Sequence, residues 1–182
     1  MCLSFSPTKQ DQLWGDIINI VRRAAATFAA FFAVLFVASP AHADAAGYPL
    51  ANSARPSNFC ATPEGNSTAN GTVITLWTCN GNDLQMFYWR GDALVHSASG
   101  KCLTPRGNST ANGAVLTLWT CTGSSVQNFD QVRGSQTTIR PSNARDKCLT
   151  NYGGSQANGV WVTLWTCASN PPAEQQWSWT GN

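Results

Sequence analysis

Charged side chains and histidines are the scarcest functional groups in this sequence. The 182 residues include only 11 Lys and Arg, 9 Asp and Glu, and 2 His. The basic residues are scattered, so we expect no nucleic-acid-binding surface, which requires Lys and Arg clustered on one face. After position 43 the single histidine is His96, and no Cys-x-x-Cys pair occurs, which argues against a zinc site. We therefore predict neither a metal nor a cofactor.

The residue combinations that catalysis requires are missing as well. There is no Gly-x-Ser-x-Gly motif, and after position 43 no second histidine that could pair with a nucleophile. Glycoside hydrolysis needs two carboxylates flanking a cleft, whereas the only glutamates, Glu64 and Glu174, occupy non-equivalent places in the chain. We predict that the protein is not an enzyme, and that His96 is a loop residue rather than a general base.

A long apolar segment is also missing. The run Ala24–Ala38 is shorter than the roughly 20 residues that span a bilayer. It follows Arg22-Arg23 and precedes Ala41-His42-Ala43, which is the order of a secretory signal with an A-x-A cleavage site. We predict a signal peptide at residues 1–43 and one exported domain at residues 44–182, with no membrane span after cleavage. A retained anchor and a twin-arginine signal are the alternatives.

What the chain has instead is a threefold internal repeat. The pentapeptide Thr-Leu-Trp-Thr-Cys occurs three times, each time preceded by Ala-Asn-Gly and followed by Gln-x-aromatic, at Thr75–Cys79, Thr117–Cys121 and Thr163–Cys167. Two of the repeats, compared over Thr62–Gly81 and Thr104–Gly123, are identical at 16 of 20 positions. We place the repeats at about residues 48–90, 91–133 and 134–182.

Cysteines follow the same repeat. Six remain after the predicted cleavage, an even number typical of an exported chain. Each repeat holds two cysteines that are 19 positions apart. Because equivalent units should form equivalent bonds, we predict the disulfides Cys60–Cys79, Cys102–Cys121 and Cys148–Cys167.

Each repeat also predicts short strands joined by tight turns. The Asn-Gly pair, for example Asn70-Gly71, favours a type I′ hairpin turn. The strand that follows alternates, with aliphatic residues on one face and threonine and tryptophan on the other. We expect the aliphatic face to form the common core, together with Phe87, Phe129 and Trp177, and the tryptophan face to point outward. Further strand patterns bring each repeat to about four strands.

As a set, these motifs resemble the ricin B-chain lectin family, which includes the carbohydrate-binding modules of bacterial xylanases. The resemblance rests on Cys102-Leu103-Thr104, Cys148-Leu149-Thr150, the Asn-Gly turns, Leu-Trp-x-Cys and the final Gln-x-Trp, and covers roughly Tyr48 to Trp179. It implies an all-β protein, a β-trefoil of twelve strands in three repeats with pseudo-threefold symmetry and one disulfide per repeat.

The resemblance further implies up to three shallow sugar sites, one in each repeat. The aromatic residue that would stack on a pyranose ring is Trp77, Trp119 or Trp165. Galactose-binding members carry three polar residues in each site. The position of their Asp is held here by Thr62, Thr104 and Thr150, and that of their Gln by Thr75, Thr117 and Thr163. The position of their Asn is held by Leu84, Val126 and Glu174. Since a carboxylate forms hydrogen bonds about twice as strong as neutral groups do, its loss predicts weak sites that bind a glycan or polysaccharide together.

Some candidate residues have a structural reading beside the functional one. The three tryptophans could instead pack over the disulfides. The glutamines of the Gln-x-aromatic motif, Gln85, Gln127 and Gln175, are more often structural than ligand contacts. The third repeat is favoured as the functional one, because it contains Tyr152, Trp161 and Glu174. We expect Glu174 to be the only acid near a site.

Taken together, the sequence predicts a secreted, monomeric, non-catalytic lectin-like module whose partner is a carbohydrate. The alternative is a β-trefoil that has lost sugar binding and acts as a protein-binding inhibitor or an adhesion protein.

Overall fold

The computed structural model describes residues 47–53, 58–132 and 137–179. The predicted signal peptide and its cleavage site lie outside these residues. The described residues form twelve strands, which are β1 (Tyr48–Asn52), β2 (Phe59–Pro63), β3 (Ile74–Thr78), β4 (Met86–Arg90), β5 (Ala93–His96), β6 (Cys102–Pro105), β7 (Leu116–Trp119), β8 (Phe129–Val132), β9 (Thr138–Pro141), β10 (Lys147–Asn151), β11 (Val162–Thr166) and β12 (Trp177–Trp179). The prediction of an all-β chain with four strands in each repeat is confirmed.

Six of these strands close into a ring. Antiparallel ladders join β12 to β1, β1 to β4, β4 to β5 and β8 to β9. The backbone bond from Phe129 N–H to the Asp92 carbonyl links β8 to β5, and the bond from Trp177 N–H to the Thr137 carbonyl links β12 to β9. These ladders and bonds link the six strands in a cycle, and closing a sheet on itself in this way leaves few unpaired edges.

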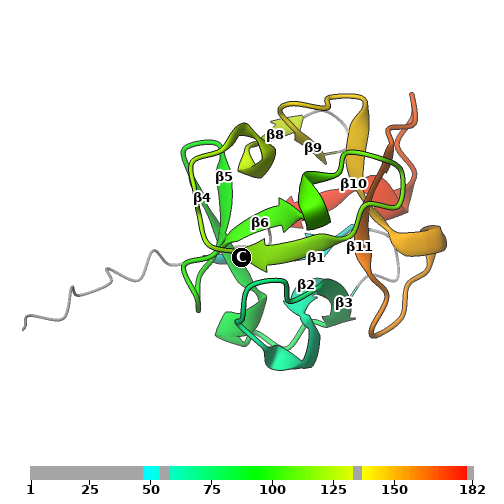
Figure 1. Ribbon diagram of the computed structural model, residues 1–182. Helices are drawn as coiled ribbons and strands as arrows, with labels where there is room; N and C mark the ends of the chain where they lie inside the picture. The colour runs from blue at the N-terminus through cyan, green and yellow to red at the C-terminus, as the bar shows by residue number, and fades with distance from the viewer. Residues whose placement is uncertain (1–46, 54–57, 133–136, 180–182) are drawn as a thin grey trace, which may run out of the picture. The chain divides into compact units, whose positions relative to one another are not determined.

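The remaining six strands form three hairpins, one per repeat, which can be followed in Figure 1: β2 with β3, β6 with β7, and β10 with β11. Two kinds of 3₁₀ turn accompany them. One follows the first hairpin strand, at η1 (Glu64–Asn66), η3 (Arg106–Asn108) and η5 (Tyr152–Gly154). The other precedes the last strand of the repeat and carries the motif glutamine, at η2 (Asp83–Gln85), η4 (Ser125–Gln127) and η6 (Ala173–Gln175).

The aliphatic strand face forms the core, as the alternation predicts. Ile74, Leu76 and their counterparts in the other repeats are at most 1% exposed. They join one cluster with Phe87, Phe129 and Trp177. Burying residues of this size contributes roughly 1.5–3 kcal/mol each relative to leaving them exposed. The core is therefore assembled from equivalent positions of all three repeats.

The three disulfides form as predicted from the repeat, between Cys60 and Cys79, Cys102 and Cys121, and Cys148 and Cys167. Each joins the first strand of a hairpin to a residue one or two positions after the second strand. In the chain-entropy model a loop of this length contributes about 3 kcal/mol per bridge.

Two local predictions are wrong. The Asn-Gly pair does not form a type I′ turn, because Gly71 has φ +86° while Asn70 is not among the residues with positive φ. The turn lies inside a ten-residue loop between β2 and β3, and its closing bond runs from Thr72 N–H to the Ala69 carbonyl. His96 is not a loop residue either, since it ends strand β5 and is 0% exposed.

Candidate functional site

The repeated tryptophans mark three equivalent surface positions. Each lies at or next to the end of the second hairpin strand, where the strand leaves the core. Trp77, Trp119 and Trp165 are 47%, 46% and 43% exposed, whereas Thr75, two positions earlier on the same strand face, is 2% exposed. The expectation that the indole rings face solvent is confirmed. The structural alternative, rings covered by packing, describes Trp177 instead, which is 1% exposed and donates its indole N–H to the Leu149 carbonyl at 3.0 Å.

A hollow lies beside each tryptophan, between the two 3₁₀ turns of its repeat. We call these hollows site 1, site 2 and site 3, after their repeats. Their volumes are about 260, 330 and 450 Å³. In every site the first hairpin threonine, the tryptophan and the motif glutamine belong to the lining.

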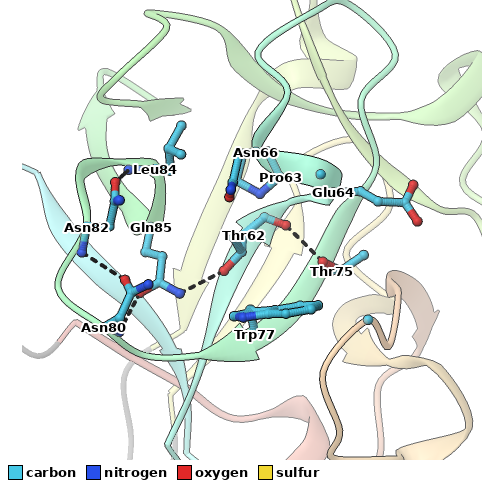
Figure 2. Close-up of a pocket in the computed structure, with 12 residues that line it drawn as sticks. Thr62, Pro63, Glu64, Asn66, Thr75, Trp77, Asn80, Asn82, Leu84 and Gln85 are labelled. Atoms are coloured by element: carbon cyan, nitrogen blue, oxygen red, sulfur yellow. Dashed lines mark hydrogen bonds between the residues drawn. The ribbon is translucent and has the colours of Figure 1, made fainter.

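The motif glutamine holds the floor of its site together, as Figure 2 shows for site 1. Gln85 is 1% exposed, and its amide N–H groups donate to the Thr62 hydroxyl and the Thr78 carbonyl, both at 3.0 Å. Its carbonyl accepts from the backbone N–H of Asn80 at 2.9 Å. Gln127 and Gln175 make the same set of bonds in the other two sites.

The candidate threonines are bound to the backbone in the same way. The Thr62 hydroxyl donates to the Cys60 carbonyl at 3.0 Å, and the Thr75 hydroxyl donates to the Thr62 carbonyl at 3.1 Å. Their counterparts repeat both bonds, namely Thr104 and Thr117 in site 2 and Thr150 and Thr163 in site 3. The polar groups under each indole ring therefore already have partners within the protein.

The strand end next to each tryptophan is bound by a neighbouring repeat, which the sequence did not reveal. The Asn158 side-chain carbonyl accepts from the backbone N–H of Thr78 at 2.8 Å, directly after Trp77. Asn112 does the same for Thr166 at 2.9 Å, and Asn70 for Thr120 at 3.0 Å. The repeats are thus linked in a closed cycle, one to two, two to three and three to one. The recurrence of Asn in all three turns is the sequence signal for this bond, but the turn preference of Asn-Gly alone is sufficient to explain it.

The adjacent glycine brings the same turn against the indole ring. A Cβ atom at Gly71 would lie 3.6 Å from Cζ3 of Trp119, and one at Gly113 would lie 3.7 Å from Cζ3 of Trp165. Gly159 belongs to the lining of site 1. The positive φ of these glycines, between +83° and +86°, is a conformation that other residues rarely adopt. Trp119 and Trp165 are therefore supported from one side by a turn of another repeat, whereas no atom lies within 4 Å of a Cβ built at Gly159.

Two buried side chains fix the turns that carry the glutamines. The Asn52 amide donates to the carbonyls of Ala173, Glu174 and Gln176, at 3.3, 3.4 and 3.0 Å. His96 holds the corresponding turn of the first repeat, with Nε2 3.0 Å from the Leu84 carbonyl and Nδ1 2.8 Å from the Ser99 hydroxyl. Nε2 therefore carries the proton and donates. Burial lowers the pKa of His96 below its ordinary 6.5, against a smaller opposing effect of the Leu84 bond.

The rims of the sites differ although their floors are alike. The first position of the turn after the first hairpin strand is Glu64 in site 1, Arg106 in site 2 and Tyr152 in site 3. Glu174 is therefore not the only acid near a site, and that expectation is wrong. Figure 2 shows the Glu64 side chain extending away from Trp77, however.

The third repeat carries additional exposed aromatic residues. Tyr152 and Trp161 are 53% and 43% exposed, and their ring centroids are 6.2 Å apart at an interplanar angle of 54°. Trp161 forms an isolated bridge with Thr75 of the first repeat.

The described residues include no group of three or more His, Cys, Asp or Glu that could hold a metal ion. No helix among them combines the length and the hydropathy needed to cross a membrane.

Comparison with known proteins agrees with this architecture. The family model of the ricin-type β-trefoil lectin domain matches residues 49–129 and 93–182. No curated protein gives a significant match to the sequence.

Solved structures with the same fold include the designed threefold-symmetric protein ThreeFoil, with a TM-score of 0.64 and 23% identity over 72% of this chain and 96% of that one. The Rhizoctonia solani agglutinin has a TM-score of 0.62 and 21% identity over 74% and 94% of the two chains. The C-terminal half of an earthworm R-type lectin, solved with GalNAc, has a TM-score of 0.57 and 13% identity over 72% and 96%. At these identities the likeness shows the fold alone.

Proposed function

Because the chain belongs to the ricin-type β-trefoil lectin domain family, we propose that it is a carbohydrate-binding module that uses Trp77, Trp119 and Trp165 as stacking platforms. Both the fold and the family suggest carbohydrate binding, and one structural relative was solved with GalNAc bound. The observation that carries the proposal is the exposure of the same large side chain at three equivalent positions. A single exposed hydrophobic residue is ordinary, but tryptophan is enriched at binding surfaces, and its exposure at the same position of every repeat favours a contact surface.

Each site is expected to bind weakly, because its floor has few free polar groups. The Thr62 hydroxyl already donates to one group and accepts from another, and the amide of Gln85 is fully bonded. A sugar would therefore be held by stacking on the indole ring and by groups on the rim. In this proposal the threonines and glutamines of the three sites support the platform from below. Three weak sites on one rigid body bind a polymer more tightly than a monosaccharide, because the second contact is intramolecular.

We also propose that the module is non-catalytic and exported. Among the described residues, the lining of site 1 includes one carboxylate, Glu64, that of site 3 includes one, Glu174, and that of site 2 includes none. Hydrolysis of a glycosidic bond would need two such groups in one site. Three disulfides support export, since such bonds persist in oxidising compartments.

The test is a glycan array with a polysaccharide affinity gel, run on the mature chain and on the triple variant Trp77→Ala, Trp119→Ala, Trp165→Ala. The matched control is Tyr48→Ala, which removes an aromatic residue that is 52% exposed but lines none of the three sites. We expect the triple variant to unfold at nearly the wild-type temperature and to lose binding, while the control keeps it. Unchanged glycan binding by a folded triple variant would reject the stacking sites. Absence of glycan binding by the wild type would favour the protein-binding alternative.

A further inference from the structure

Site 3 differs from the other two sites by a pair of exchanges that face each other. The third residue of the turn after the first hairpin strand is Asn66 in site 1 and Asn108 in site 2 but Gly154 in site 3. The residue before the motif glutamine is Leu84, Val126 and Glu174 in the same order. A Cβ atom at Gly154 would lie 3.5 Å from Oε1 of Glu174. The carboxylate thus lies in the space that an asparagine side chain would need.

The backbone that carries this carboxylate is fixed from below. The Asn52 amide, which is 1% exposed, binds three carbonyls of the segment around Glu174. Asn52 itself accepts a bond from the Gln156 amide at 3.1 Å. These bonds fix the backbone from which the Glu174 side chain projects, and a backbone that is already ordered reduces the entropy that ligand binding must overcome at this turn.

The second feature of site 3 is an exposed aromatic surface, formed by Tyr152 and Trp161, that lies next to the rim of the hollow. Tyr152 belongs to the lining of site 3 and also contacts Trp161, so the hollow and the aromatic pair are continuous. At the position of Trp161 the other repeats carry Val73 and Val115. Val73 is 6% exposed, which shows that a small side chain satisfies the packing there. A tryptophan that remains 43% exposed at this position adds surface that the packing does not require.

We propose that site 3 is an extended site that binds at least two consecutive residues of a neutral oligosaccharide; this inference rests on the proposed function. One ring stacks on Trp165 with its hydroxyl groups directed to the Glu174 carboxylate, and the chain continues over Tyr152 and Trp161. The carboxylate accepts charge-assisted hydrogen bonds from hydroxyls. It repels uronic or sulfated sugars through like charge. Sites 1 and 2 carry Glu64 and Arg106 in place of Tyr152, so they lack its aromatic surface and hold a single ring each.

The proposal predicts that the affinity of site 3, and of no other site, rises with the number of sugar residues in the oligosaccharide. The background Trp77→Ala, Trp119→Ala isolates this site. Isothermal titration with neutral series of one to four residues, namely xylo-, cello- and galacto-oligosaccharides, should show affinity rising with length for at least one series. In this background Trp161→Val, which installs the residue of the other repeats, should lower the affinity for the longer members by roughly three- to tenfold. Its affinity for the monosaccharide should not change.

The reciprocal variant tests the same idea by gain of function. Arg106→Tyr together with Val115→Trp transfers the aromatic pair to site 2 in the background Trp77→Ala, Trp165→Ala. This protein should acquire the chain-length dependence that its parent lacks. Glu174→Gln keeps the shape of the side chain and removes its charge, so it should weaken binding of the neutral series and reduce discrimination against oligogalacturonate.

The outcomes separate this proposal from the proposed function. If Trp165→Ala abolishes binding in the isolated site while Trp161→Val leaves the length dependence unchanged, the extended site is rejected and the stacking function stands. If site 3 binds oligogalacturonate better than every neutral series, or binds no neutral series, the proposal is overturned. If binding by the intact protein survives the loss of all three platform tryptophans, the proposed function itself fails.

Discussion

The side-chain carbonyl of Asn70 accepts hydrogen bonds from both the backbone N–H and the hydroxyl of Thr120, at 3.0 and 3.2 Å, across 50 positions of sequence. The Asn70 amide returns a bond to the same hydroxyl at 3.0 Å. Thr120 directly follows Trp119, so a residue of the first repeat fixes the strand end that displays the platform of the second. Next to it, Gly71 N–H donates to the Leu118 carbonyl at 2.8 Å.

Replacing Asn70 with alanine should therefore affect a site in another repeat. We expect the free energy of unfolding to fall by about 1 kcal/mol, because bonds between Asn70 and Thr120 are lost at an exposed position. Chemical denaturation measures this change. Saccharide binding should weaken at site 2 and not at site 1, as titration of single-site backgrounds would show. The control is Asn143→Ala, which changes an exposed asparagine outside the sites. A loss of saccharide binding confined to site 1 would contradict the inference that Asn70 supports site 2.

His96 should make stability depend on pH. Burial lowers its pKa below 6.5 in the folded protein, so the unfolded chain binds the proton more readily. The stabilisation is fully present above about pH 6.5 and is lost as the pH falls toward the folded-state value. His96→Gln keeps an amide donor for the Leu84 carbonyl and removes the titration. Urea denaturation between pH 7.5 and 5 should show wild-type stability decreasing more steeply than that of the variant; parallel curves would exclude His96 as the cause.

Asn151 should be replaceable by proline with a gain in stability. Its side-chain nitrogen and oxygen are buried, and neither has a hydrogen-bond partner among the residues that the structure describes. The other repeats carry Pro63 and Pro105 here, at φ −62°, and Asn151 has φ −67°, which proline adopts without strain. Removing the unpaired amide and restricting the unfolded chain should add about 1–2 kcal/mol.

Thermal and urea unfolding of Asn151→Pro measure this gain. Asn151→Ala separates the two effects, because it removes the amide without restricting φ. A proline variant less stable than wild type would mean that the amide, or the backbone N–H, has a partner such as an ordered water.

The sequence predicted those features that depend on short-range periodicity. Alternation around Ile74 and Leu76 indicated the core face, and the constant spacing of cysteines such as Cys60 and Cys79 indicated the disulfides. Exposure of Trp77 followed from the same alternation, because the aliphatic residues and the tryptophan lie on opposite faces of the strand and the aliphatic face is the one that packs into the core.

The features that were missed depend on contacts across repeats. Asn70 could be read as a turn residue because its partner Thr120 is distant in sequence and shows no complementary pattern. His96 was placed in a loop because nothing local indicates that its ring fills a buried space against Phe87, at a centroid distance of 5.1 Å. Glu64 was overlooked as a neighbour of site 1 because the turn that carries it had not been predicted.

The indole N–H resonances of the protein test the central claim most directly. A ¹H–¹⁵N correlation spectrum, assigned with single Trp→Phe variants, would be followed during titration with the saccharide that binds in the array. We predict that the resonances of Trp77, Trp119 and Trp165 shift with the ligand, whereas that of Trp177, buried and bonded to the Leu149 carbonyl, stays in place. Saturable binding that leaves the three exposed indole resonances unmoved would contradict the account.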